Sequence, residues 1–155
     1  MQLIILGLVA LFLLWAGLIV WTYFGVKAEA RKVYAAALQR GEFPATEPYE
    51  PFETAYLKTS ILRVSIYRWL ASVTAVIALP IVVWLLNTLW VRLYYLTSAD
   101  GVFAEGTLIH SFYLAVGCML GLVLVAGVYA RAYHKGRKTN FEVEWADEKQ
   151  RLATN

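Results

Sequence analysis

Three long stretches of this sequence contain no Asp, Glu, Lys or Arg, and they constrain the fold more than any other feature. They are residues 3–24, 69–91 and 107–130, and each is longer than 20 residues. About 20 apolar residues in a helix cross a hydrocarbon layer of roughly 30 Å. Strands in lipid must instead close into a barrel of alternating polarity. Because the runs are continuously apolar, they predict transmembrane helices.

Composition excludes several other classes of protein. The chain is 60% hydrophobic and only 16% charged, unlike an ordinary soluble domain. A single cysteine, Cys118, excludes a disulfide-rich secreted module, and a net charge of +3 is too small and dispersed for a nucleic-acid binder. We therefore predict an all-α integral membrane protein with one membrane domain, residues 1–155. Its spans are expected at about 3–25, 69–92 and 107–131.

Basic residues are distributed unevenly around the predicted spans, which indicates an orientation. Of the 14 Lys and Arg residues, 13 lie in the loop 26–68 or from Arg131 onward, and only Arg92 adjoins the hairpin 93–106. Basic loops stay on the cytoplasmic side. We expect the loop and the tail 132–155 inside, and the N-terminus and hairpin outside. The expected location is a bacterial inner membrane, crossed several times.

The connecting segments differ in composition. Residues 26–40 keep a helical composition, which predicts that the first helix extends into the cytoplasm and stops near Gly41. Residues 42–53 hold three prolines and four glutamates, which predicts an extended, solvated turn. An interfacial helical segment is expected from Thr54. Beyond Asn140, apolar and acidic residues alternate, which indicates a short strand or extended peptide, with a disordered end as the alternative.

Small residues in the third apolar run predict close helix packing. Gly117 and Gly121 form a GxxxG pair, and Ala126 and Ala130 form a second pair at the same spacing. Small residues let two helix backbones approach closely in lipid. Asn87, in the second run, is costly in lipid, and we expect it to face another helix.

A basic collar follows the third run. Arg131, Lys135, Arg137 and Lys138 are expected to contact lipid head groups, including those of anionic lipids. Trp145, farther along the tail, is expected to contact a partner protein or the membrane surface. The expected partners are thus membrane lipids and other integral membrane subunits, with no nucleic acid.

The sequence holds no recognisable catalytic or metal-binding motif. Its two histidines, His110 and His134, would stand about 36 Å apart on one helix, so they cannot share a metal. Cys118 sits in an apolar helix, where burial makes a thiol inert. We expect no enzyme activity, no metal and no cofactor. The one candidate ligand is His110, whose simpler interpretation is an interfacial histidine.

These observations favour a non-catalytic structural or accessory subunit of a larger membrane complex, such as a respiratory or photosynthetic energy-converting assembly. Two alternatives stay open. One is a homo-oligomeric channel or pore lined by the polar residues of the second run, Ser72, Thr74, Asn87 and Thr88. The other is a subunit that holds a haem or pigment through His110.

Overall fold

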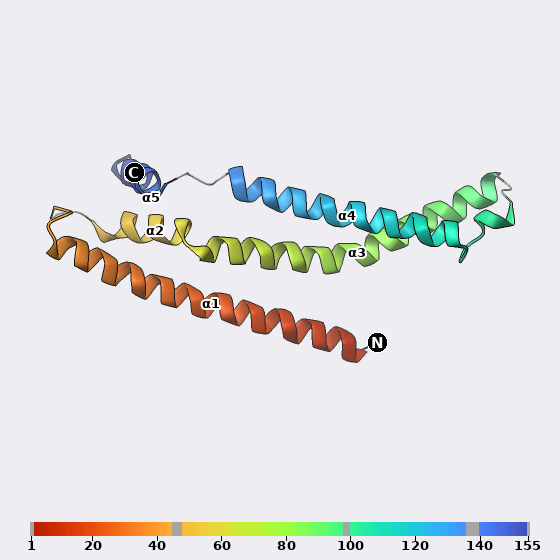
Figure 1. The fold of residues 1–155 in the computed structure, drawn as a ribbon, viewed down its shortest axis with the longest axis horizontal. Helices are drawn as coiled ribbons and strands as arrows, with labels where there is room; N and C mark the ends of the chain where they lie inside the picture. Colours follow the sequence, from red (N-terminus) through yellow and green to blue (C-terminus); the bar gives the residue numbers. More distant parts are fainter. Residues whose placement is uncertain (1, 45–47, 98–99, 136–139, 155) are drawn as a thin grey trace. The chain divides into compact units, whose positions relative to one another are not determined.

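The computed structural model describes residues 2–44, 48–97, 100–135 and 140–154, and over these residues the chain is all-helical (Figure 1). In chain order the elements are α1 (Gln2–Gln39), α2 (Tyr49–Thr59), α3 (Ile61–Thr97), the short 3-10 helix η1 (Gly101–Phe103), α4 (Leu108–Lys135) and α5 (Phe141–Ala153). In this part of the chain, α1, α3 and the α4 segment are long and apolar enough to cross a membrane. The prediction of an all-helical chain with three long apolar helices is confirmed.

Helix α1 runs without interruption through the first apolar run and the predicted extension. It ends where Gly41 adopts a positive φ of 72°, a conformation that glycine reaches without strain. The amide of Gly41 donates to Leu38 O at 3.1 Å, and the amide of Glu42 donates to Ala37 O at 3.0 Å. This pair of bonds is a Schellman motif, which satisfies the last carbonyls of the helix.

Helix α2 corrects the expectation of an extended turn over residues 42–53. The helix begins at Tyr49, so the second half of that stretch is helical. Pro48 is the N-cap, with extended backbone, and Pro51 lies in the first turn. The first amides of a helix have no intrahelical acceptor, so a proline there removes no hydrogen bond. The prediction of a turn was wrong because it relied on the number of prolines and not on their positions relative to the start of the helix.

A break at Ser60 separates α2 from α3. The hydroxyl of Ser60 donates to Leu57 O at 2.7 Å, and the hydroxyl of Thr59 donates to Ala55 O at 2.9 Å. Such local bonds compete with the helical ladder and favour a helix end. Helix α3 then continues to Thr97 with Pro80 inside it.

Helix α5 overturns the expectation of a strand, extended peptide or disordered end beyond Asn140. The Asn140 side chain accepts a hydrogen bond from Phe141 N at 3.1 Å, and Glu142 and Glu144 occupy the first turn. Acidic residues at a helix N-terminus are favoured by the helix dipole. In this helix Phe141 and Trp145 share a face at i, i+4 spacing, so the strand or extended peptide predicted from the alternation is wrong.

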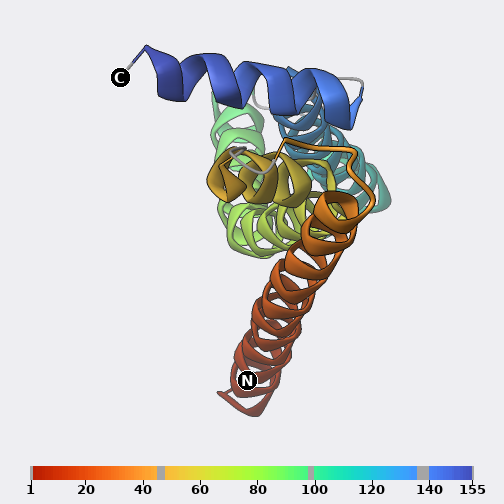
Figure 2. The same ribbon diagram turned by 90° about the vertical axis from the view of Figure 1, so that its left-hand side faces the viewer.

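The chain divides into two compact units, residues 1–69 with 133–155 and residues 70–132. In the first unit, α2 lies between α1 and α5, and α5 runs across α2 (Figures 1 and 2). The second unit is the antiparallel hairpin of α3 and α4. The buried apolar side chains of the described residues are few and belong to the first unit: Val26, Ala30, Ala37, Phe52, Ala55 and Leu62. The apolar runs themselves are largely exposed.

Candidate functional site

The charged and aromatic groups of the first unit gather in a small helical head, which we define as residues 26–43, the end of α1 and the turn after it, together with α2 and α5. Phe52 of α2 is its centre and is only 2% exposed. Its ring lies 5.2 Å from Tyr34 and 5.7 Å from Trp145, measured between ring centroids. Phe43 and Trp145 meet edge to face at 4.6 Å. Aromatic pairs of this geometry add stabilisation beyond area burial, so the cluster fixes α5 on α2.

Small residues let α1 and α2 approach each other beneath this cluster. Ala30 of α1 and Ala55 of α2 are completely buried, and Ala37 is 2% exposed. An ion pair of 2.7 Å between Lys27 Nζ and Glu53 Oε1 joins the same two helices. The head is therefore a packed unit with its own interior.

One lysine of α2 stands between two carboxylates of α5. Lys58 Nζ donates to Glu144 Oε1 at 2.9 Å and also to Glu148 Oε1. The glutamate side chains are only 8% and 10% exposed. A buried carboxylate is costly unless it is paired. The ammonium of Lys58 thus permits α5 to turn two acidic residues inward, and Arg151 reaches Glu148 at 3.7 Å from outside.

This arrangement shifts the pKa of Lys58. Desolvation by burial lowers the pKa, but the hydrogen bonds and charges of Glu148 and Glu144 together outweigh it, so the pKa is raised above its ordinary value of 10.5. Burial also raises the pKa of the Tyr56 hydroxyl, with a further contribution from Glu29. None of these shifts produces a reactive base at neutral pH, and the cluster serves to hold helices together.

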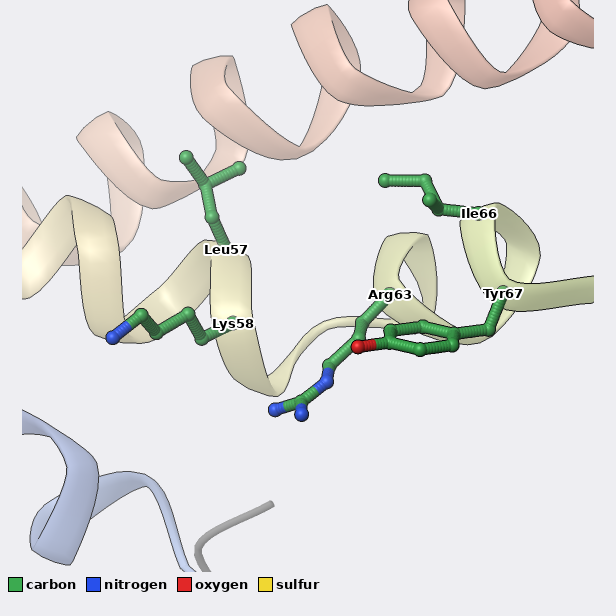
Figure 3. Close-up of a pocket in the computed structure, with 5 residues that line it drawn as sticks. All are labelled: Leu57, Lys58, Arg63, Ile66 and Tyr67. Atoms are coloured by element: carbon green, nitrogen blue, oxygen red, sulfur yellow. The ribbon is translucent and has the colours of Figure 1, made fainter. Parts of the chain in front are cut away.

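A groove opens beside the head, at the break between α2 and α3. It has a volume of about 330 Å³ and is lined by Leu57, Lys58, Arg63, Ile66 and Tyr67 (Figure 3). The guanidinium of Arg63 donates to the backbone carbonyl of Tyr133 at 3.1 Å. It also lies 5.9 Å from the centroid of the Tyr67 ring and 5.4 Å from that of Tyr133. Arg63 is therefore held in a defined position on the groove wall.

In the hairpin, α3 and α4 pack with one continuous antiparallel register. Thr74 meets Tyr129 through a hydrogen bond of 2.6 Å between their hydroxyls. At the other end, the rings of Trp90 and Tyr113 lie 4.9 Å apart. Between these ends, a Cβ placed at Gly117 would overlap Leu86 Cδ1.

The other predicted packing residues occupy different environments. A Cβ at Gly121 would make an ordinary contact of 3.7 Å with Val82. Ala126 and Ala130 lie at exposed positions of α4. Asn87 Nδ2 donates to Glu105 Oε1 at 3.1 Å, so its amide bonds to the segment that joins the two helices.

His110 lies in an aromatic setting near the start of α4. It is 5% exposed, and its ring is 5.6 Å from that of Trp90. Nδ1 accepts a hydrogen bond from Gly106 N at 3.1 Å, which assigns the proton of the neutral ring to Nε2. Nε2 is buried and has no hydrogen-bond partner within the described part of the chain. In this tautomer neither nitrogen presents an accessible lone pair to a haem or pigment metal.

The structure describes some of the predicted lipid and partner contacts. Arg131 and Lys135 are exposed near the end of α4, whereas Arg137 and Lys138 lie outside the described residues. Trp145 packs in the aromatic cluster of the head, and Lys149 Nζ lies 3.8 Å from its ring centroid.

Sequence reasoning missed the residues that organise the head. Phe52 lies in the stretch predicted as a solvated turn, Lys58 in the predicted interfacial segment, and Glu144 and Glu148 beyond Asn140 in the tail, yet together they form the core and the ion cluster of the head. The i, i+4 spacing of the two glutamates was a readable signal, since it matches the face that carries Phe141 and Trp145. The pairing with Lys58 could not be predicted from the sequence, because Glu144 lies 86 residues and Glu148 lies 90 residues beyond it in the chain.

Within the described ranges, no three His, Cys, Asp or Glu side chains converge in a way that could hold a metal ion. The groups that converge in the head are a cluster of aromatic rings and the ion cluster of Lys58 with Glu144 and Glu148. Such a combination packs helices against one another. Comparison with models of protein families, with characterised proteins and with solved structures finds no match to this chain.

Proposed function

We propose that this chain is a multi-pass membrane protein that acts as a non-catalytic structural or accessory subunit of a larger membrane complex. One observation supports the proposal above all others. In the residues that the structure describes, none of the most apolar stretch of α1, α3 or α4 is buried within the chain. Side chains such as Leu14, Trp84 and Leu124 are 65–70% exposed. Apolar surface as extensive as this must be covered, either by lipid or by other apolar helices.

The polar groups in the predicted spans favour a packing role over a conducting one. Thr74 bonds to Tyr129, and Asn87 bonds to Glu105. The hydroxyl of Thr88 donates to Trp84 O at 2.8 Å, within its own helix. Pore-lining groups must instead offer their hydrogen bonds to water or ions. The bonds of Thr74 and Asn87 are therefore better explained by stabilisation of the hairpin, and the bond of Thr88 by its own helix.

The proposed orientation follows from the charge asymmetry of the sequence. With 13 of 14 basic residues in the loop and tail segments, the helical head would lie in the cytoplasm and the segment between α3 and α4 outside. A bacterial inner membrane is the proposed location, and a respiratory or photosynthetic energy-converting assembly is the proposed class of host. The head would then present a rigid, independently packed surface to cytoplasmic parts of that assembly.

Purification of the tagged chain from its native membranes in mild detergent tests this proposal. We expect other integral membrane proteins to co-purify with it in fixed ratio, and a variant that lacks residues 141–155 to retain less of them. An absorption spectrum of the same sample addresses the cofactor alternative. A chromophore that depends on His110 would support that alternative, and purification of the chain alone would contradict the subunit proposal.

A further inference from the structure

The start of α4 is a capping box in which a histidine replaces the usual glutamate or glutamine. Thr107 precedes the helix, and its carbonyl accepts the first helical bond from Ser111 N at 3.0 Å. Its hydroxyl accepts a bond from the backbone N–H of His110 at 3.4 Å. In a capping box the third helical residue returns a side-chain bond to a free backbone N–H before the helix. Here Nδ1 of His110 accepts from Gly106 N at 3.1 Å.

Histidine differs from glutamine as a capping residue because its charge changes near neutral pH. An imidazole in water takes up a proton at about pH 6.5. A proton on Nδ1 of His110 would occupy the lone pair that accepts from Gly106, so two N–H donors would face each other. The dipole of the helix also disfavours a positive charge at its N-terminus. Protonation is therefore incompatible with the bonded cap.

The ring has no way to relieve this conflict in place. His110 is 5% exposed, and its ring centroid lies 5.6 Å from that of Trp90. Nε2 has no hydrogen-bond partner among the residues that the structure describes. A charged ring in this position would carry two buried N–H donors, neither with an acceptor in that part of the chain, which is costly. The proton is therefore accommodated only when the ring leaves its place and Gly106 loses its bond.

The neighbouring titratable groups do not share this response. Within two helical turns of Trp90 and His110, the charged and titratable side chains of the described residues are Arg92, Tyr94 and Tyr95 of α3, Asp100 and Glu105 of the connecting segment, and Tyr113 of α4. Arginine and tyrosine ordinarily keep their charge state between pH 5 and 8, and carboxylates ordinarily titrate below that range. Histidine is therefore the residue type of this set that gains a charge there.

We propose that His110 is a pH-sensitive cap, which fastens Gly106 to the start of α4 at neutral pH and releases it in weakly acidic conditions. Two bonds from α3 to the connecting segment, donated by Trp90 Nε1 and by Asn87 Nδ2, do not depend on the histidine. The release therefore begins at Gly106 and the first turn of α4. In the proposed orientation this segment lies outside, so the cap would respond to external pH. That consequence alone rests on the proposed function, and exchange measured in detergent does not depend on it.

Hydrogen exchange of the Gly106 amide at different pH values tests the cap. The full chain, in mild detergent with whatever proteins stay bound, is exchanged between about pH 7.5 and pH 5, and each rate is divided by the intrinsic rate at that pH. If only the released state takes up the proton, protection should fall about 30-fold over this range. His134→Gln removes the other histidine, which is exposed, and should leave the fall unchanged. Equal protection at the two pH values would overturn the proposal.

Two variants and one spectroscopic measurement assign the response to a group. His110→Gln keeps an acceptor for Gly106 but does not titrate, so its protection should change less than about twofold, and a fall of about 30-fold would overturn the role of His110. Glu105→Gln should retain the fall, and its loss would assign the response to Glu105 instead. The His134→Gln chain leaves the cap intact and holds one histidine, so ¹⁵N NMR reads its ring alone. Nδ1 should lack a proton at about pH 7.5 and gain one as protection is lost, whereas a proton on Nδ1 already at pH 7.5 would overturn the cap.

Discussion

Replacement of Lys58 by Met should loosen α5 from the helical head. Methionine keeps an unbranched apolar stem of the same number of atoms but removes the ammonium that stands between Glu144 and Glu148. Both carboxylates are about nine-tenths buried, so neither can regain full hydration while α5 stays docked. The prediction therefore concerns the docking equilibrium of α5.

The magnitude follows from burial on the two sides of the cluster. Removal of one partner of a fully buried ion pair costs about 3–5 kcal/mol. The Lys58 side chain is 39% exposed, so water screens the interaction, and the expected cost falls to about 2 kcal/mol. A loss of that size lowers the ratio of docked to undocked α5 by about 30-fold. The triple variant Lys58→Met, Glu144→Gln, Glu148→Gln should recover more than half of the loss, because no charge is left unpaired.

Hydrogen exchange of the α5 amides measures this equilibrium directly. The Lys58→Met chain should exchange these amides about 30-fold faster than the unaltered chain. Lys32→Met, which removes the same charge from an exposed position of α1, should leave them unchanged. Equal exchange in the two single variants would refute the claim that the ion cluster holds α5.

The pH dependence of the same measurement has a defined sign. The pKa of Lys58 is raised in the folded chain, so its contribution to docking is fully present below the ordinary value of 10.5. That contribution is lost as the pH rises through the higher folded value. Exchange of α5 beyond the intrinsic pH effect should therefore stay constant from pH 7 to about 10 and increase only above about 10.5. An increase already at pH 8 would contradict the assigned role of the ammonium.

Three further predictions concern the predicted membrane segments. Gly117→Ala should destabilise the hairpin by no more than about 1 kcal/mol relative to Gly121→Ala, because the added methyl meets only the end of the flexible Leu86 side chain, which can shift; a loss of several kcal/mol in thermal unfolding in detergent would show that Leu86 cannot move. His110→Ala should cost about 1 kcal/mol from a lost hydrogen bond and His110→Gln less, with no absorption band lost in either case; loss of a band would favour the cofactor alternative. In cells whose chain carries a single cysteine, with Cys118 replaced by Ala, an impermeant thiol reagent should label Val102→Cys and spare Gln150→Cys, and the reverse pattern would overturn the orientation.

The parts of the fold that the sequence predicted depend on local composition. The apolar runs and the continuous α1 follow from uninterrupted helix-forming residues. The helix stop follows from Gly41, whose positive φ any side chain other than glycine would resist. These features need no knowledge of distant partners, because backbone hydrogen bonds and residue size decide them within a few turns.

The remainder depends on position within an element or on pairing between elements. Pro51 predicted a turn, although a proline in a first helical turn is harmless. The pattern of apolar and acidic residues after Asn140 fits both a strand and a helix. The Asn140 cap and the buried face of α5 show that it is a helix. Lys58 and its carboxylates could not be paired from sequence, because many basic and acidic residues were equally plausible partners and only the packing of Phe52 against Trp145 selects among them.

The mass of the particle released from native membranes tests the central claim most directly. Native mass spectrometry of the tagged chain in mild detergent should show its 17.5 kDa polypeptide within a larger particle of fixed composition that contains different membrane subunits. A particle of 17.5 kDa plus lipid would contradict the subunit proposal. A series of whole multiples of that mass would instead support a homo-oligomer and contradict it equally.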